Sequence, residues 1–102
     1  MSDYTWIESL IASYFYNRDR EQIVNMIQGT INRILDMPYG SVNAGDDDTD
    51  ILMGAITCQF GDYGTSPRFG WIYEQHKENV LEILNELLEY NITQLELEKM
   101  ED

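Results

Sequence analysis

The longest apolar pattern in the sequence recurs at intervals of three and four residues, which is the period of a helix buried along one side. Its members are Phe69, Tyr73, Val80, Ile83, Leu84, Leu87 and Leu88. Gly70 argues for a start near Tyr73, because glycine weakens a helix interior. The pattern therefore predicts one long C-terminal helix that reaches Glu98 or close to it.

Two further helices are expected in the first part of the chain, where apolar residues again follow helical spacing. Their boundaries are marked by a capping box at Thr5 and Glu8, an N-cap at Asp19 and a helix-breaking proline at Pro38. These marks predict one helix near Thr5–Tyr16 and another from Asp19 to about Asp36. Gly29 lies inside the second pattern and weakens that helix by about 1 kcal/mol relative to alanine.

The middle of the chain allows two interpretations. Aspartates within residues 46–50 precede apolar residues at helical spacing, which suits the positive end of a third helix, and Gly61 suits its C-terminal stop. Alternatively, residues 56–60 and 69–73 form the two strands of a hairpin. We favour the helix here, because the aspartates and Gly61 would mark its two ends.

The expected fold is mostly α, a compact four-helix domain with a long C-terminal helix. A chain of 102 residues, 43% of them hydrophobic, suits a single domain with one core, covering residues 1–102. The alternative is an α+β fold with a small β-hairpin near residues 56–73.

Charge limits the partners that such a domain can bind. The net charge is −13, from 19 acidic residues against 6 lysines and arginines. Residues 46–102 hold fourteen of the acids and three of the bases, so −11 of this charge lies after residue 45. Direct binding to nucleic acid is disfavoured, because a duplex is bound through cationic contacts to its phosphates. We expect instead a protein partner with a basic surface.

The sequence also lacks several features that would indicate other classes of protein. No run approaches the ~18 apolar residues of a membrane span, and Met1–Tyr4 lacks the basic start of a signal peptide. The single cysteine, Cys58, cannot form an internal disulfide, which agrees with a reducing compartment. Nucleophile elbows, phosphate-binding glycine loops and dinucleotide fingerprints are missing. We therefore expect a cytoplasmic protein that is not an enzyme and uses no membrane and no cofactor.

Six glutamates of the predicted C-terminal helix fall within one third of its circumference. They are Glu74, Glu78, Glu82, Glu86, Glu89 and Glu96. Lys77, the one lysine in this stretch, lies off that side, and the i,i+4 neighbours within this set are like charges. One interpretation is a rod of carboxylates that occupies a basic groove built for a nucleic-acid backbone. The other is an ordinary solvated side that keeps the protein soluble.

An acidic cluster lies at the predicted start of the third helix. It consists of Asp46, Asp47, Asp48 and Asp50. The alternating aspartates match the first ligand positions of an EF-hand loop, but Ile51 stands where the sharp-turn glycine belongs and Thr57 where the bidentate glutamate belongs. We therefore expect helix capping and no metal, with the first three aspartates as further partner-binding candidates.

Residues 61–71 are the predicted contact loop, with Tyr63, Arg68 and Trp71 as its binding side chains. Aromatic residues and arginine are enriched at protein interfaces, because they bury a large area and keep a polar tip paired.

His76 has no second histidine or thiolate within helical reach, so it is expected at the edge of the core and not in a zinc site. Cys58 has no nucleophile signature and is expected to be a small buried residue.

Two functions from different classes fit these features. The first is a protein-binding inhibitor that presents its acidic side to a cationic site of a nucleic-acid enzyme. Anti-restriction, anti-CRISPR and nuclease-immunity proteins act through the same kind of electrostatic attraction. This chain is similar to them in size and charge alone. The second is a homo-oligomeric adaptor, such as a homodimer, that pairs through Leu81–Leu95 of the C-terminal helix.

Overall fold

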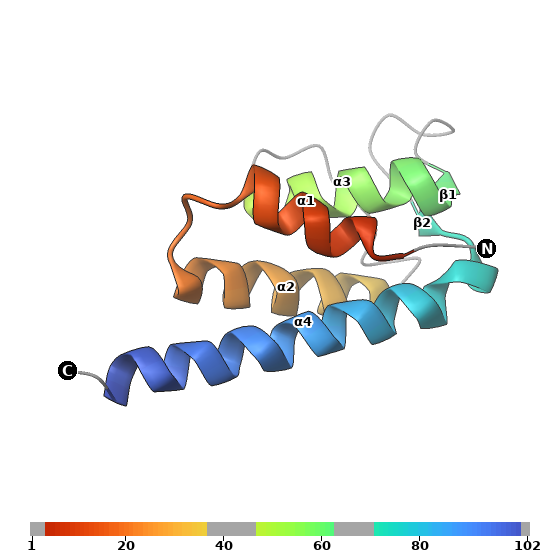
Figure 1. Cartoon of the computed structure of the whole chain (residues 1–102). Coiled ribbons are helices and arrows are strands. Elements are labelled where there is room, and N and C mark those ends of the chain that lie inside the picture. The colour runs from red at the N-terminus through yellow and green to blue at the C-terminus, as the bar shows by residue number, and fades with distance from the viewer. Residues whose placement is uncertain (1–3, 37–46, 63–70, 101–102) are drawn as a thin grey trace.

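The computed structural model describes residues 4–36, 47–62 and 71–100, and these ranges contain four helices (Figure 1). The helices are α1 (Trp6–Tyr14), α2 (Arg20–Leu35), α3 (Asp48–Phe60) and α4 (Glu74–Met100). α4 packs mainly along α2, and both α1 and α3 lie above this pair in Figure 1. The predicted fold, four helices with a long C-terminal helix, is confirmed.

The helix boundaries follow most of the predicted marks. The Asp19 backbone N–H donates to Gln22 Oε1 at 2.9 Å, which caps the start of α2. The helix ends at Leu35, ahead of Pro38. Gly61 follows the last residue of α3. The predicted Thr5 capping box is wrong, because the Thr5 backbone is already helical and its side chain makes no capping hydrogen bond. An N-cap needs an extended backbone to aim its side chain at the first turn.

The hairpin alternative is wrong for its first strand. Residues 56–60 belong to α3 and are helical. The strand pairing that the structure describes joins only β1 (Gly61–Asp62) to β2 (Trp71–Ile72), antiparallel, with Gly61 opposite Ile72. Directly after β2, the Tyr73 N–H donates to the Phe60 carbonyl at 3.0 Å. This short ladder fixes the start of α4 beside the end of α3.

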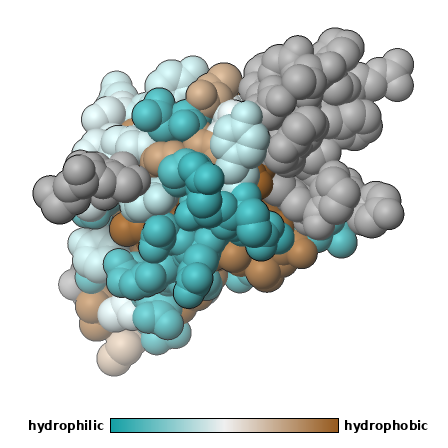
Figure 2. Space-filling model, turned by 90° about the vertical axis from the view of Figure 1, so that its right-hand side faces the viewer, coloured by the Kyte–Doolittle hydropathy of each residue, from teal (hydrophilic) through white to brown (hydrophobic). Residues whose placement is uncertain are grey.

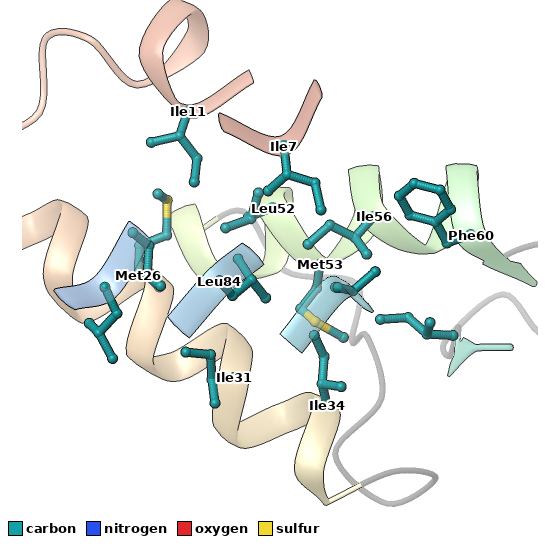
Figure 3. Close-up of a cluster of buried hydrophobic side chains, with 14 of the residues drawn as sticks. Ile7, Ile11, Met26, Ile31, Ile34, Leu52, Met53, Ile56, Phe60 and Leu84 are labelled. Carbon is teal, nitrogen blue, oxygen red and sulfur yellow. The ribbon is translucent and has the colours of Figure 1, made fainter. Parts of the chain in front are cut away.

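The core is formed by apolar side chains from all four helices, which point toward one another between the layers (Figure 3). Its fully buried members include Ile7, Phe15, Ile27, Ile34, Leu52, Met53, Ile56, Val80 and Leu84. Val80, Leu84 and Leu88 form the buried stripe of α4, as their spacing predicts. Tyr73, which the same pattern includes, precedes the helix and is 47% exposed.

Gly29 marks a close approach between α2 and α3. A Cβ at this position would lie 3.1 Å from Thr49 Oγ1 and 3.3 Å from Thr49 Cγ2. The cost of a glycine within a helix is about 1 kcal/mol relative to alanine. A Cβ here would require the Thr49 side chain to move by a few tenths of an ångström, which is a packing reason for glycine at this position.

Candidate protein-interaction site

The predicted rod of carboxylates forms one side of α4. We call it the glutamate face, and its members are Glu74, Glu78, Glu82, Glu86, Glu89 and Glu96, all of which are exposed. The face lies opposite the stripe of Val80, Leu84 and Leu88, which packs into the core. Burial of that stripe directs the glutamates away from the body of the protein.

The described arginines neutralise other acids and leave the glutamate face charged. Arg18 pairs with Asp48 at 2.9 Å, Arg20 with Glu98 at 3.2 Å, and Arg33 with Asp50. Within residues 4–36, 47–62 and 71–100, no ion pair involves a member of the glutamate face or either of Lys77 and Lys99. The charge of the face is therefore available to a partner.

The acidic cluster at the start of α3 has mostly internal duties. Asp47 is the N-cap, and its carboxylate accepts from the Asp50 N–H at 2.9 Å. Asp48 accepts from both Nε and Nη2 of Arg18, at 2.9 and 3.1 Å. Asp46 lies outside the described residues. The capping prediction is confirmed for Asp47, whereas Asp48 is already paired and has less charge to offer a partner.

Both arginine pairs at α3 join elements that are distant in sequence. The hydrogen bond to Asp48 raises the pKa of Arg18 against the opposing effect of desolvation. The Arg18 pair connects the turn after α1 to α3, and the Arg33 pair connects α2 to α3 with Asp50 only 8% exposed. Both pairs therefore connect segments that are distant in the chain, which the sequence alone did not reveal.

The predicted contact loop is described only at its ends. Tyr63 and Arg68 lie outside the described residues. Trp71 is placed by its backbone in β2, opposite Asp62. These three residues therefore stay predictions for partner binding.

A groove between α1 and α4 is a surface that our sequence analysis missed. Its volume is about 510 Å³, and its apolar lining comes from Ile11 and Ala12 of α1, Ile23 of α2, and Ile83 and Leu87 of α4. Tyr16 and Tyr90 stand at its edge and are 77% and 58% exposed. The signal for it was a second apolar stripe on α4, Ile83, Leu87 and Tyr90, beside the buried one.

Charged residues from both helices border this groove. Glu8 of α1 and Glu86 of the glutamate face line it and are exposed. Arg20 also lines it, but its Nη1 donates to Asn91 Oδ1 at 2.8 Å and its Nε to Glu98 at 3.2 Å. The unpaired charge at the groove is therefore negative and adjoins the glutamate face.

A cluster of aromatic side chains lies at the N-terminal end of α4. His76 is half-buried as predicted, and its Nδ1 lies 2.9 Å from the Tyr4 hydroxyl. The centroid of its ring lies 5.1 Å from that of Phe60, with the two rings tilted by 41°. These contacts anchor α4 to α3 and to the start of α1.

Cys58 is exposed, so the prediction of a buried cysteine is wrong. The buried face of α3 is formed by its neighbours Ile56, Thr57 and Phe60.

Figure 2 shows the end of the molecule at which α4 begins. Hydrophilic residues cover the middle of this view, with apolar residues exposed beside them (Figure 2).

Within the described residues, no cluster of three or more His, Cys, Asp or Glu side chains is arranged to hold a metal ion. Of the helices that the structure describes, none has the length and apolar character needed to cross a membrane.

Comparison with known proteins adds no relative. The sequence matches no protein-family model, no curated protein and no solved structure.

Proposed function

We propose that this protein is a non-enzymatic binding module that presents the glutamate face of α4 to a basic surface of another protein. The observation that supports this most directly is the unequal pairing of charge. Every described arginine is paired with an acid outside the face, while six glutamates on one side of one helix have no cationic neighbour within ion-pair distance among the described residues. Complementary charge is what speeds association and selects partners.

The geometry favours a partner surface that binds nucleic acid. At a rise of about 1.5 Å per residue, Glu74 and Glu96 lie about 33 Å apart along α4. One strand of DNA places a phosphate about every 3.4 Å along its axis. The glutamate face therefore has roughly half the linear charge density of one strand. We propose that the protein acts as an inhibitor by occupying a basic nucleic-acid-binding site.

The adaptor alternative is less well supported by the packing. It requires Leu81, Leu84, Leu88 and Leu95 to face a second copy. Leu84 is 0% exposed and Leu88 is 9% exposed, because both pack within the domain. Pairing through this seam would have to compete with the core, and two copies with a net charge of −13 each would repel one another.

Competition with nucleic acid tests the proposal. The full chain is used to capture proteins at low salt, and each captured protein is then titrated with a labelled oligonucleotide in the presence of increasing amounts of the chain. We expect a basic partner, displacement of the oligonucleotide at about 0.1 M salt, and direct binding of the chain to the partner that weakens as ionic strength rises from about 0.1 M to about 1 M. Simultaneous binding of chain and oligonucleotide would contradict the inhibitor function.

A further inference from the structure

The groove between α1 and α4 offers a kind of contact that the glutamate face cannot provide. Ile11, Ile23, Ile83 and Leu87 supply an aliphatic lining in a volume of about 510 Å³. This volume falls within the roughly 300–1,000 Å³ of typical binding pockets. Apolar side chains that enter such a groove lose contact with water, and the resulting attraction does not weaken in salt.

The charges beside the groove indicate the chemistry of its occupant. Glu8 and Glu86 border the apolar lining from two different helices, and Arg20 is occupied by Asn91 and Glu98. An occupant with apolar side chains flanked by lysines or arginines would match both the lining and its edges. A second copy of this chain would bring further negative charge to the same edges, so it is a poor match.

We propose that this groove binds an amphipathic helical segment of the partner, with apolar residues inserted between α1 and α4 and basic residues at Glu8 and Glu86. Helix-in-groove recognition places such apolar anchors at i, i+3 or i+4, and i+7. The inference rests on the proposed function, because it names the part of the basic partner that the protein holds. The glutamate face then adds salt-sensitive attraction, and the groove adds salt-resistant anchoring.

A pair of synthetic peptides separates the two contributions. Each has about 14 residues, roughly four helical turns. One has leucines at the anchor positions and lysines on both flanks, and the other has serines in place of the leucines. Binding of each labelled peptide to the full chain is measured by fluorescence anisotropy at about 0.1 M and about 1 M salt. We expect the leucine peptide to bind more tightly, and to keep most of this advantage at high salt.

Matched variants locate the binding. Ala12 is exposed and lines the groove, whereas the exposed neighbour Ser13 does not line it. Ala12→Trp should fill the groove and weaken leucine-peptide binding by about tenfold or more, and Ser13→Trp should leave it unchanged. The same substitutions should leave serine-peptide binding unchanged.

Other outcomes would contradict the binding of a partner helix in this groove. Equal binding of the two peptides, no binding of either, or equal effects of Ala12→Trp and Ser13→Trp would overturn the groove proposal. Equal, salt-sensitive binding that Glu78→Lys/Glu82→Lys removes would still leave the proposed function standing. Self-association of the wild type that Ala12→Trp abolishes, measured by analytical ultracentrifugation, would identify a second copy as the occupant and also overturn the proposal.

Discussion

Replacing Glu78 and Glu82 with glutamine should make the protein more stable. Glu78 lies four residues from Glu74 and from Glu82, and Glu82 lies four residues from Glu86, so the two substitutions remove three like-charge pairs at i,i+4 spacing. Each such pair costs about 0.2–0.5 kcal/mol. Glutamine and glutamate have similar helix propensity. The free energy of unfolding should therefore rise by about 0.6–1.5 kcal/mol at low salt.

Urea unfolding at low and high salt measures this effect. At about 1 M salt the Debye length falls to about 3 Å, so the stabilisation should largely disappear. In thermal unfolding, 1 kcal/mol corresponds to about 4–8 °C for a domain near this size. Glu21→Gln/Asp36→Asn is the matched control, since it removes the same charge at exposed positions at opposite ends of α2, where the two effects on the helix dipole offset each other.

Two results would refute the reasoning. If the control variant gains as much stability as Glu78→Gln/Glu82→Gln, overall net charge and not the spacing on α4 is responsible. If the stabilisation persists at high salt, it does not come from repulsion within the glutamate face. The predicted result would instead show that the face opposes folding, which is expected of a surface kept for binding.

Three further predictions concern the fold. Leu84→Ala removes a fully buried side chain of α4 and should lower the free energy of unfolding by about 2–5 kcal/mol in urea titration, and a loss below about 1 kcal/mol would contradict its burial in the core. Asp50→Ala removes the buried partner of Arg33 and should cost about 2 kcal/mol, whereas Asp50→Ala in an Arg33→Ala background should cost clearly less. Gly29→Ala should stabilise by about 1 kcal/mol in a Thr49→Ala background and by less in the wild type, and equal effects in both would show that the Thr49 contact does not restrict this position.

The sequence predicted the elements of this fold better than their contacts. Helix starts and stops are local, so Asp19, Pro38 and Gly61 identified boundaries that the structure places close by. The prediction of a capping box at Thr5 was wrong, because Tyr4 O already accepts from the Ile7 N–H. The chain therefore turns into α1 one residue earlier than a capping box allows. A residue type that favours capping does not reveal its own backbone angles.

The candidate site was predictable only where it depends on one helix. The glutamate face follows from the spacing within α4, because burial of one side exposes the opposite side. The Arg18–Asp48 and Arg33–Asp50 pairs join residues 30 and 17 positions apart, and the groove depends on how α1 crosses α4. Such contacts are set by packing between helices, which periodicity within a single helix does not specify.

We expect the location of the charge on α4, and not the total charge of the protein, to determine binding. The measurement that tests it most directly is the Kd for the captured partner, as a function of salt, for the wild type, Glu78→Lys/Glu82→Lys and Glu21→Lys/Asp36→Lys. The two variants have the same net charge and differ only in where the lysines lie. We predict that the first binds about tenfold more weakly, about 1.4 kcal/mol, with a flatter salt dependence, and that the second stays close to the wild type. Equal effects of the two variants, or no effect of either, would contradict the claim.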